Sequence, residues 1–339
     1  MDVTAKDSND QTILQYACKF ETAKIAKYLI GLGKFNLLAK DNSKNTLLHI
    51  AAENGNFEIV KYLIDLRQID VTVKNKYKET ILHKACHSGN IELVKYLIGL
   101  NQFDIKAENS KNETLLHLAA KSKNFELIKY LIGLNKIDVK APGPKKNTIL
   151  HIACSNDNLD LVKYLVKLDQ FDLTATNNSE ENVLHIACKN GRLDIVKYLV
   201  ELEKIDIKDM DDSQETILHL ACQSGNELLV KYIISLNAID ILAVNDYDKT
   251  ILHFAADSKN LHLMSYLIKL NKIDINAKDK SDETILNIAV KNNNIELVKL
   301  LSKQKNIDFT VKDDDDTNLL MLACKTGNLE LVKFIMEQT

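Results

Sequence analysis

Apolar and polar positions alternate along this chain in a pattern that returns with one fixed period. Each repeat opens on Thr or Asn, continues with two short apolar segments and closes with a polar stretch. The opening residues are spaced 34 apart with no insertion, which indicates ten repeats of one shape that stack to bury their apolar surface. We call these opening residues the anchors: Thr12, Thr46, Thr80, Thr114, Thr148, Asn182, Thr216, Thr250, Thr284 and Asn318.

The two apolar segments of each repeat have the features of short α-helices, as the third repeat illustrates. Residues 80–89 read T-I-L-H-K-A-C-H-S-G, with an N-capping Thr and a final Gly suited to left-handed geometry. Residues 90–100 read N-I-E-L-V-K-Y-L-I-G-L, where Asn90 can cap and Glu92 lies in the first turn. We name these segments helix A and helix B. Eight repeats have Asn at the helix B cap: Asn56, Asn90, Asn124, Asn158, Asn226, Asn260, Asn294 and Asn328.

The polar stretch that closes each repeat predicts a projecting loop. Residues 102–113 read Q-F-D-I-K-A-E-N-S-K-N-E, a brief alternating piece followed by turn-forming residues. This pattern suits a hairpin-like loop between helix B and the next helix A.

The motif at the start of helix A resembles the T-P-L-H-x-A-A signature of ankyrin repeats. L-H-x-A recurs in seven repeats, as in T-L-L-H-I-A-A at 46–52 and T-I-L-H-L-A-C at 216–222. Tetratricopeptide repeats share the period, but they use tryptophan, which is absent here, and have no extended loop. The resemblance covers nearly the whole chain. It implies an all-α fold, a helix-turn-helix solenoid with projecting hairpin loops, and we expect residues 1–339 to form a single solenoid of ten repeats.

Two departures from the family pattern are visible. Ile, Leu or Val replaces the motif proline after every anchor, so the first turn loses a preset backbone angle and keeps a buried apolar side chain. One residue is also inserted after helix B, as in Asn101-Gln102-Phe103. We expect the fold to survive and the hairpins to project somewhat differently.

Composition and charge exclude some classes of function. The 339 residues are 45% hydrophobic and 27% charged with a net charge of −3, which is typical of a folded chain and offers no basic footprint for nucleic acid. The amino terminus lacks a signal-peptide pattern, and no apolar run is long enough to span a membrane. We therefore expect a soluble, cytoplasmic monomer that neither binds nucleic acid nor inserts into a membrane.

Three side-chain columns suggest chemistry, and each has a structural explanation. Seven histidines lie three residues after an anchor, but stacked repeats place them about 10 Å apart, too far to share a metal ion. The family resemblance implies that they hydrogen-bond to backbone within and between repeats. All six cysteines lie six residues after an anchor, where other repeats have Ala or Val, which predicts packing thiols in a reducing compartment. Eight tyrosines on helix B suit half-buried filler with a solvated hydroxyl.

The sequence offers no site for catalysis. It contains no Walker loop, dinucleotide fingerprint, nucleophile elbow, H-E-x-x-H or kinase motif. We expect a protein that is not an enzyme and needs no cofactor or metal.

The resemblance implies that a partner protein binds the concave face, through the hairpin tips and the end of helix A. The tips carry Tyr at two equivalent positions, Pro142 and Pro144 stiffen one tip, and exposed aromatic side chains are frequent hot spots. We predict partner contacts at Lys76, Tyr77, Lys78, His87, Lys121, Pro142, Lys145, Lys146, Asp211, Asp212, Tyr247 and Asp257.

Charge differs between the two halves of the loop series. The seven residues before each anchor total +4 over repeats two to five and −11 over repeats six to ten. Our hypothesis is that a partner places its acidic part near Lys76, Lys78, Lys145 and Lys146. Its basic part would lie near Asp209, Asp211, Asp212 and residues 313–316, and such charges mainly set orientation and association rate. The alternative is that these are simply solvated loops.

The leading function is therefore a protein-interaction scaffold. An alternative is that the array is the targeting or substrate-recruiting region of a larger enzyme, channel, toxin or secreted effector. The chain starts with M-D-V-T-A-K-D, which matches the loop I-D-V-T-V-K-N at 69–75, so we expect a fragment of a longer protein.

Overall fold

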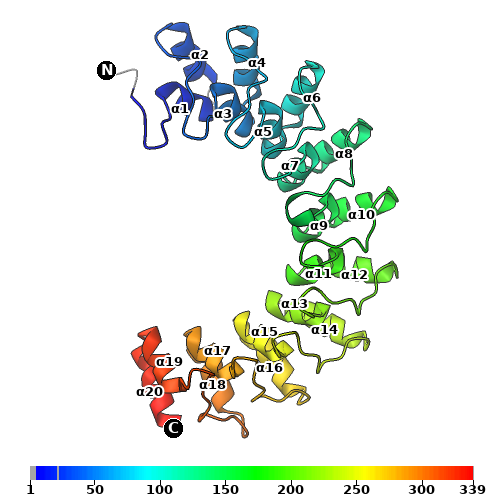
Figure 1. Cartoon of the computed structure of the whole chain (residues 1–339), viewed down its shortest axis with the longest axis vertical. Coiled ribbons are helices and arrows are strands. Elements are labelled where there is room, and N and C mark those ends of the chain that lie inside the picture. Colours follow the sequence, from blue (N-terminus) through cyan, green and yellow to red (C-terminus); the bar gives the residue numbers. More distant parts are fainter. Residues whose placement is uncertain (1–4, 21–22, 339) are drawn as a thin grey trace. The chain divides into compact units, whose positions relative to one another are not determined.

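The computed structural model describes residues 5–20 and 23–338, and it is all-helical within them (Figure 1). Two α-helices form in each repeat, and no strand is present in these residues. Helix A of the successive repeats spans Ile13–Lys19 (α1), Leu47–Glu53 (α3), Ile81–Ser88 (α5), Leu115–Lys121 (α7), Ile149–Ser155 (α9), Val183–Lys189 (α11), Ile217–Ser224 (α13), Ile251–Asp257 (α15), Ile285–Lys291 (α17) and Leu319–Thr326 (α19). Helix B spans Ala23–Gly31 (α2), Phe57–Asp65 (α4), Ile91–Gly99 (α6), Phe125–Gly133 (α8), Leu159–Lys167 (α10), Leu193–Glu201 (α12), Glu227–Ser235 (α14), Leu261–Lys269 (α16), Ile295–Ser302 (α18) and Leu329–Gln338 (α20). The predicted all-α repeat solenoid is confirmed.

Helix A begins and ends where the sequence predicts. Thr80 has extended backbone angles, φ −91° and ψ 171°, and α5 starts at the next residue. Gly89 follows the helix with φ 77°, a left-handed conformation that glycine adopts without a steric penalty.

The asparagine caps of helix B have a second role that the sequence did not reveal. Asn90 Oδ1 accepts the backbone N–H of Leu93 at 3.0 Å, which is the expected cap, while Asn90 Nδ2 donates to the carbonyl of Gly55 at 2.8 Å. Asn124 and Asn260 make the same pair of bonds. Each of these caps therefore joins its repeat to the preceding one.

The chain divides into two compact parts, Met1–Phe171 with repeats one to five and Asp172–Thr339 with repeats six to ten. Within each part, consecutive A helices pack side by side and each also packs against its own helix B (Figure 1). The core lies between the row of A helices and the row of B helices and is built mainly from Leu, Ile, Val and Ala. Whether the ten repeats act as one array stays a prediction.

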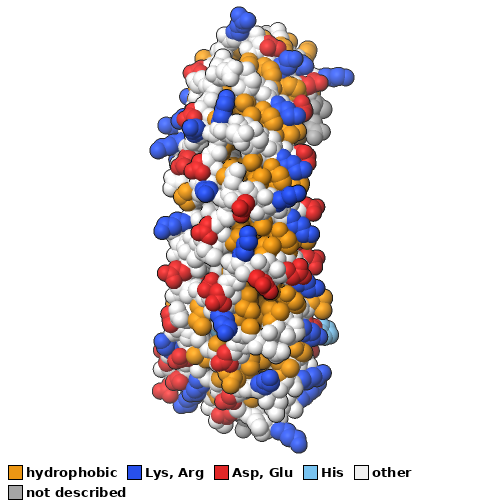
Figure 2. Space-filling model, turned by 90° about the vertical axis from the view of Figure 1, so that its right-hand side faces the viewer, with side chains coloured by type: hydrophobic (Ala, Val, Ile, Leu, Met, Phe, Trp, Pro, Cys, Tyr) orange, Lys and Arg blue, Asp and Glu red, His pale blue; other side chains and the backbone are white. Residues whose placement is uncertain are grey.

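The helix B side carries the tyrosine column. Tyr62, Tyr96 and Tyr266 are half-buried as predicted, whereas Tyr28 in the first repeat is 68% exposed. Lysines of the preceding repeat lie over several of these rings; Lys231 Nζ, for example, is 4.9 Å from the Tyr266 centroid. On the face seen in Figure 2, hydrophobic side chains are accordingly interleaved with Lys, Asp and Glu.

The loops form short hairpin-like turns that touch one another. Met210 and Thr216 form an isolated antiparallel bridge across one such loop. The tips are linked by backbone hydrogen bonds, such as Lys76 N–H to Ser43 O at 2.8 Å and Asp246 N–H to Ser213 O at 2.9 Å. In the described residues, we find no helix with both the length and the apolar character needed to cross a bilayer.

Candidate functional site

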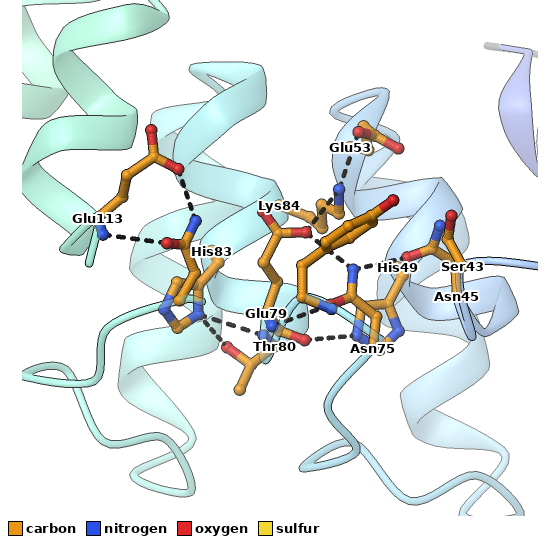
Figure 3. A network of polar contacts seen from close by, with 12 residues as sticks. Ser43, Asn45, His49, Glu53, Asn75, Glu79, Thr80, His83, Lys84 and Glu113 are labelled. Atoms are coloured by element: carbon orange, nitrogen blue, oxygen red, sulfur yellow. Dashed lines mark hydrogen bonds and ion pairs between the residues drawn. The ribbon is translucent and has the colours of Figure 1, made fainter. Parts of the chain in front are cut away.

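Histidines of several repeats tie helix A to the loop of the next repeat, as His49 does in Figure 3. His49 Nδ1 accepts the backbone N–H of Thr46 at 3.3 Å, so the ring proton is on Nε2, which donates to the Glu79 carbonyl at 3.0 Å. His117 and His253 make the equivalent inter-repeat bonds at 3.2 and 3.1 Å. The predicted structural role of the histidines is confirmed.

Burial keeps these imidazoles neutral. It lowers the pKa of His83 and of His219 to about 4, and it lowers the pKa of His49, His117, His185 and His253 as well. The rings of His49 and His117 are held at both nitrogens and have no free position for a ligand, whereas His83 Nε2 is buried without a hydrogen-bond partner. Among residues 5–20 and 23–338, no group of three or more His, Cys, Asp or Glu side chains is placed to hold a metal ion.

The cysteines are packing residues, with one exception. Cys18, Cys86, Cys154, Cys188 and Cys222 are buried free thiols, and burial raises the pKa of each, that of Cys18 to about 12. Cys324 is exposed, contrary to the expectation for this column. It lies on α19, the helix A of the tenth repeat.

A buried Asn or Asp five residues before most anchors shapes the loops. Asn75 Oδ1 accepts the backbone N–H groups of Tyr77 and Glu79 at 2.9 and 3.0 Å, and Asn75 Nδ2 donates to Asn45 Oδ1 at 2.9 Å (Figure 3). These bonds close a tight turn and tie it to the preceding loop. The residues between Asn75 and Glu79 consequently project outward.

Most of the predicted partner-binding residues are exposed in the structure. Tyr77 is 41% exposed and Tyr247 is 56% exposed, each at the tip of its loop. The loop residues Lys76, Lys78, Pro142, Lys145, Lys146 and Asp212 are exposed, as are His87, Lys121 and Asp257 at the ends of helix A. Lys121 is ion-paired with Glu113, and Asp257 accepts a hydrogen bond from Asn292 at 3.1 Å. The structure therefore presents eleven of the twelve predicted positions to solvent.

Asp211 is buried, unlike the other predicted partner-binding residues. Only 4% of its surface is exposed, and Oδ1 accepts the backbone N–H groups of Ser213 and Glu215 at 3.0 and 2.8 Å. Asp211 is thus the turn-shaping residue of its loop, equivalent to Asn75. Its position five residues before an anchor was the signal that could have shown this.

Ion pairs at the end of helix A form a feature that sequence reasoning missed. Lys84 Nζ lies 2.9 Å from Glu79 and 3.0 Å from Glu53, bridging a loop to the preceding helix A (Figure 3). Burial alone would raise the pKa of Glu79, but hydrogen bonds from Lys84 and Asn75 lower it below its usual value. In three other repeats the residue before the anchor is Glu, paired with the Lys seven residues after the anchor: Glu113 with Lys121, Glu181 with Lys189, and Glu283 with Lys291.

Glu215 breaks this pairing. It precedes the anchor Thr216, but the position seven residues after that anchor is Gln223, and the partner of Glu215 is the neutral Asn245 Nδ2 at 3.2 Å. Burial raises the pKa of Glu215 above its usual value, and the charge of the nearby Asp211 raises it further. Burial also raises the pKa of Asp211. This loop therefore concentrates acidic side chains, and Lys189 of the preceding repeat acts on Glu215 only through the charge interaction, without an ion pair.

Comparison with known proteins places these repeats. No curated protein matches the chain in a sequence search. The family model for ankyrin repeats (3 copies) matches residues 1–75, 66–143, 134–211, 203–279 and 267–339. Ankyrin repeats are generally protein–protein interaction modules, and proteins built from them are typically non-catalytic adaptors. With its family model matched from end to end and the helix pairs, anchor hydrogen bonds and hairpin loops in place, this chain belongs to the ankyrin repeat family.

Proposed function

We propose that this chain is a protein-interaction scaffold that binds a partner protein through its hairpin tips and the exposed ends of helix A. The observation that carries the proposal is the contrast between anchored and exposed positions in each loop. Asn75 and His49 hold the backbone of the loop at residues 75 and 79 by hydrogen bonds. The residues between these two points, Lys76, Tyr77 and Lys78, face solvent, and their types differ from repeat to repeat. Exposed, variable side chains on a rigid frame are suited to recognition.

We propose further that the ten repeats act as one array whose loops orient the partner by charge. The boundary at Phe171 between the two compact parts coincides with the change in loop charge, from a total of +4 in repeats two to five to −11 in repeats six to ten. A partner with an acidic and a basic region would be steered into one orientation, mainly through a faster association rate.

Photo-cross-linking tests the proposed surface. A benzoylphenylalanine residue replaces Tyr77 or Tyr247 at the loop tips, or Lys61 or Glu203 on the helix B side, all of which are exposed. We expect one partner protein to cross-link at positions 77 and 247 and not at 61 or 203. Cross-linking confined to the helix B side would refute a loop-based interface.

A further inference from the structure

Four exposed apolar side chains lie in two consecutive hairpin loops of the C-terminal part. Met210, in the loop before α13, is 44% exposed. Leu242, Val244 and Tyr247, in the loop before α15, are 56%, 46% and 56% exposed. We call these four residues the loop patch. Apolar side chains left in water at the tips of rigid loops favour a binding role over a packing role.

The two loops that carry the patch are in direct contact through hydrogen bonds. The backbone N–H of Asp246 donates to the Ser213 carbonyl at 2.9 Å, and Asn245 Nδ2 reaches Glu215 Oε1 at 3.2 Å. Met210 and Val244 are equivalent, since each lies six residues before an anchor. The stacking of the repeats therefore places their side chains on neighbouring loops at the same register.

Backbone hydrogen bonding fixes which side chains face outward. Asp211 and Asn245, the residues next in sequence to Met210 and Val244, are buried and hold their turns with side-chain oxygens. Because consecutive side chains of an extended segment point to opposite sides, Met210 and Val244 point to solvent. Burying the Met210 and Val244 side chains would require the hydrogen bonds of both turns to break.

Acidic side chains outnumber basic ones around the patch, where the exposed Lys208 lies next to Asp209. Asp209 and Asp212 flank Met210 along the first loop, and Asp246 and Asp248 flank Tyr247 at the tip of the second; all four are exposed. Glu215, half-buried between the loops, adds a carboxylate without a lysine partner. The nearby Lys249 is 3.7 Å from Asp279 and so is engaged by the following loop.

The N-terminal part contains the same tip with the opposite charge. Tyr77 is equivalent to Tyr247, but its neighbours are Lys76 and Lys78 in place of Asp246 and Asp248. Lys74 takes the position of Val244. The aromatic tip is therefore shared by the two parts, while the charge around it, and the apolar neighbours found only beside Tyr247, differ.

A pocket of about 260 Å³ lies beside Tyr247, between its loop and the following one, and is lined by Lys249 and Lys280 as well as by Asp279, Ser281 and Glu283. It is large enough for one side chain of a partner. An apolar side chain entering it would contact the Tyr247 ring, whereas the two lysines disfavour a cation inside the pocket.

We infer that the loop patch binds a basic peptide segment in which one large apolar side chain is flanked by arginine or lysine. The apolar residue packs against Val244, Met210 and Tyr247, and the flanking cations pair with Asp212, Asp246 and Asp248. This inference rests on the proposed function and specifies the chemistry of the partner at the C-terminal part.

Peptide binding to the full chain tests the inference by fluorescence anisotropy. The probe is a labelled peptide with one Leu between two pairs of Arg; the matched peptides replace Leu by Ser or every Arg by Glu. We expect the Arg–Leu peptide to bind, the Ser version to bind about ten-fold more weakly, and the Glu version not to bind. Met210→Ser with Val244→Ser should also weaken Arg–Leu binding about ten-fold.

Charge exchange sharpens the test. Asp246→Lys with Asp248→Lys gives the Tyr247 tip the flanking charges of the Tyr77 tip, so the variant should lose the Arg–Leu peptide. The control, Glu201→Lys with Glu203→Lys on the exposed helix B side, should keep it. Circular dichroism verifies that each variant is folded.

Two results would overturn the inference. One is that the Arg–Leu peptide does not bind. The other is that affinity is unchanged both when Leu in the peptide is replaced by Ser and when Met210 and Val244 are replaced in the protein, because binding would then reflect general charge attraction alone. If the loop positions still cross-link to a partner protein in either case, the proposed scaffold function stands and only the basic peptide is excluded.

Discussion

His49 Nε2 donates a hydrogen bond to the Glu79 carbonyl at 3.0 Å, joining helix A of one repeat to the loop of the next. Gln15, which replaces the histidine in the first repeat, still spans this interface, since its Nε2 reaches the Asn45 carbonyl at 3.3 Å. Asn287 replaces it in the ninth repeat and is one methylene shorter than glutamine. Its Nδ2 is buried and has no hydrogen-bond partner. The interface between repeats nine and ten consequently lacks a bond that others have.

Asn287→His should stabilise the protein. An unsatisfied buried donor costs about 1–3 kcal/mol, so restoring the inter-repeat bond should raise the free energy of unfolding by about 1 kcal/mol. Gln15→Asn should remove the corresponding bond in the first repeat and lower the free energy of unfolding by a similar amount. Urea unfolding monitored by circular dichroism measures both; a destabilising Asn287→His would show that the imidazole does not fit this interface.

Acidification should destabilise the fold through the buried histidines, beginning below about pH 6.5. The pKa of the buried histidines is lower in the folded chain, about 4 for His83 and His219, than the usual value of about 6.5 in an unfolded chain. Between those values the unfolded state binds more protons, so stability falls as the pH drops from about 6.5 towards 4. The urea midpoint should therefore decrease across this window.

His219→Gln separates this effect from general acid unfolding. Glutamine at this register keeps the inter-repeat bond, as Gln15 does, and cannot take up a proton. The variant should show a shallower pH dependence than the wild type. An identical slope for the two proteins would mean that the histidine column does not govern acid sensitivity.

Gly143→Ala should destabilise the Pro142–Pro144 loop. A Cβ at this position would lie 2.6 Å from His117 Cδ2 and Nε2, and the imidazole is held by its bond to Asn147. Overpacking of this kind costs about 1–3 kcal/mol. Gly133→Ala is the control, because nothing lies within 4 Å of that Cβ and alanine favours the helix, α8, by about 0.5–1 kcal/mol. We expect Gly143→Ala to lower the melting temperature and Gly133→Ala to raise it.

Gln223→Lys should supply the cation that Glu215 lacks. By analogy with Lys121 and Lys189, the new ammonium group would reach the carboxylate before the anchor, lower its pKa and add about 0.5–1 kcal/mol of stability. Carboxyl-detected NMR titration follows Glu215 directly. An unchanged pKa in the variant would mean that the lysine stays in solvent.

The helices of each repeat were predictable because the residues that begin and end them recur at fixed positions. Thr80 caps α5, Gly89 ends it and Asn90 starts α6, and each of these signals acts within a few residues of its own backbone. The role of the histidines came from the family resemblance, since it depends on the distance from His49 to a carbonyl thirty residues away.

The chemistry of the surface was less predictable because it depends on which way side chains point. Asp211 and Asp212 are adjacent in sequence, yet one is buried in its turn and the other faces solvent. The pairing of Lys84 with Glu53 joins residues of different repeats, and the contact between the loops that carry Met210 and Val244 follows only from stacking. Periodicity alone places such residues in a column and does not say what they touch.

The most direct test of the scaffold account is the rate at which the cross-linked partner, once identified, associates with a charge-reversed chain. The loop variant carries Lys145→Glu, Lys146→Glu, Asp212→Lys and Asp246→Lys, and the control reverses Lys61, Lys136, Glu201 and Glu203 on the helix B side. Stopped-flow association at low salt should be about ten-fold slower for the loop variant and lose its salt dependence, with the control unchanged. An unchanged rate for the loop variant, with a slower rate for the control, would contradict binding through the loops.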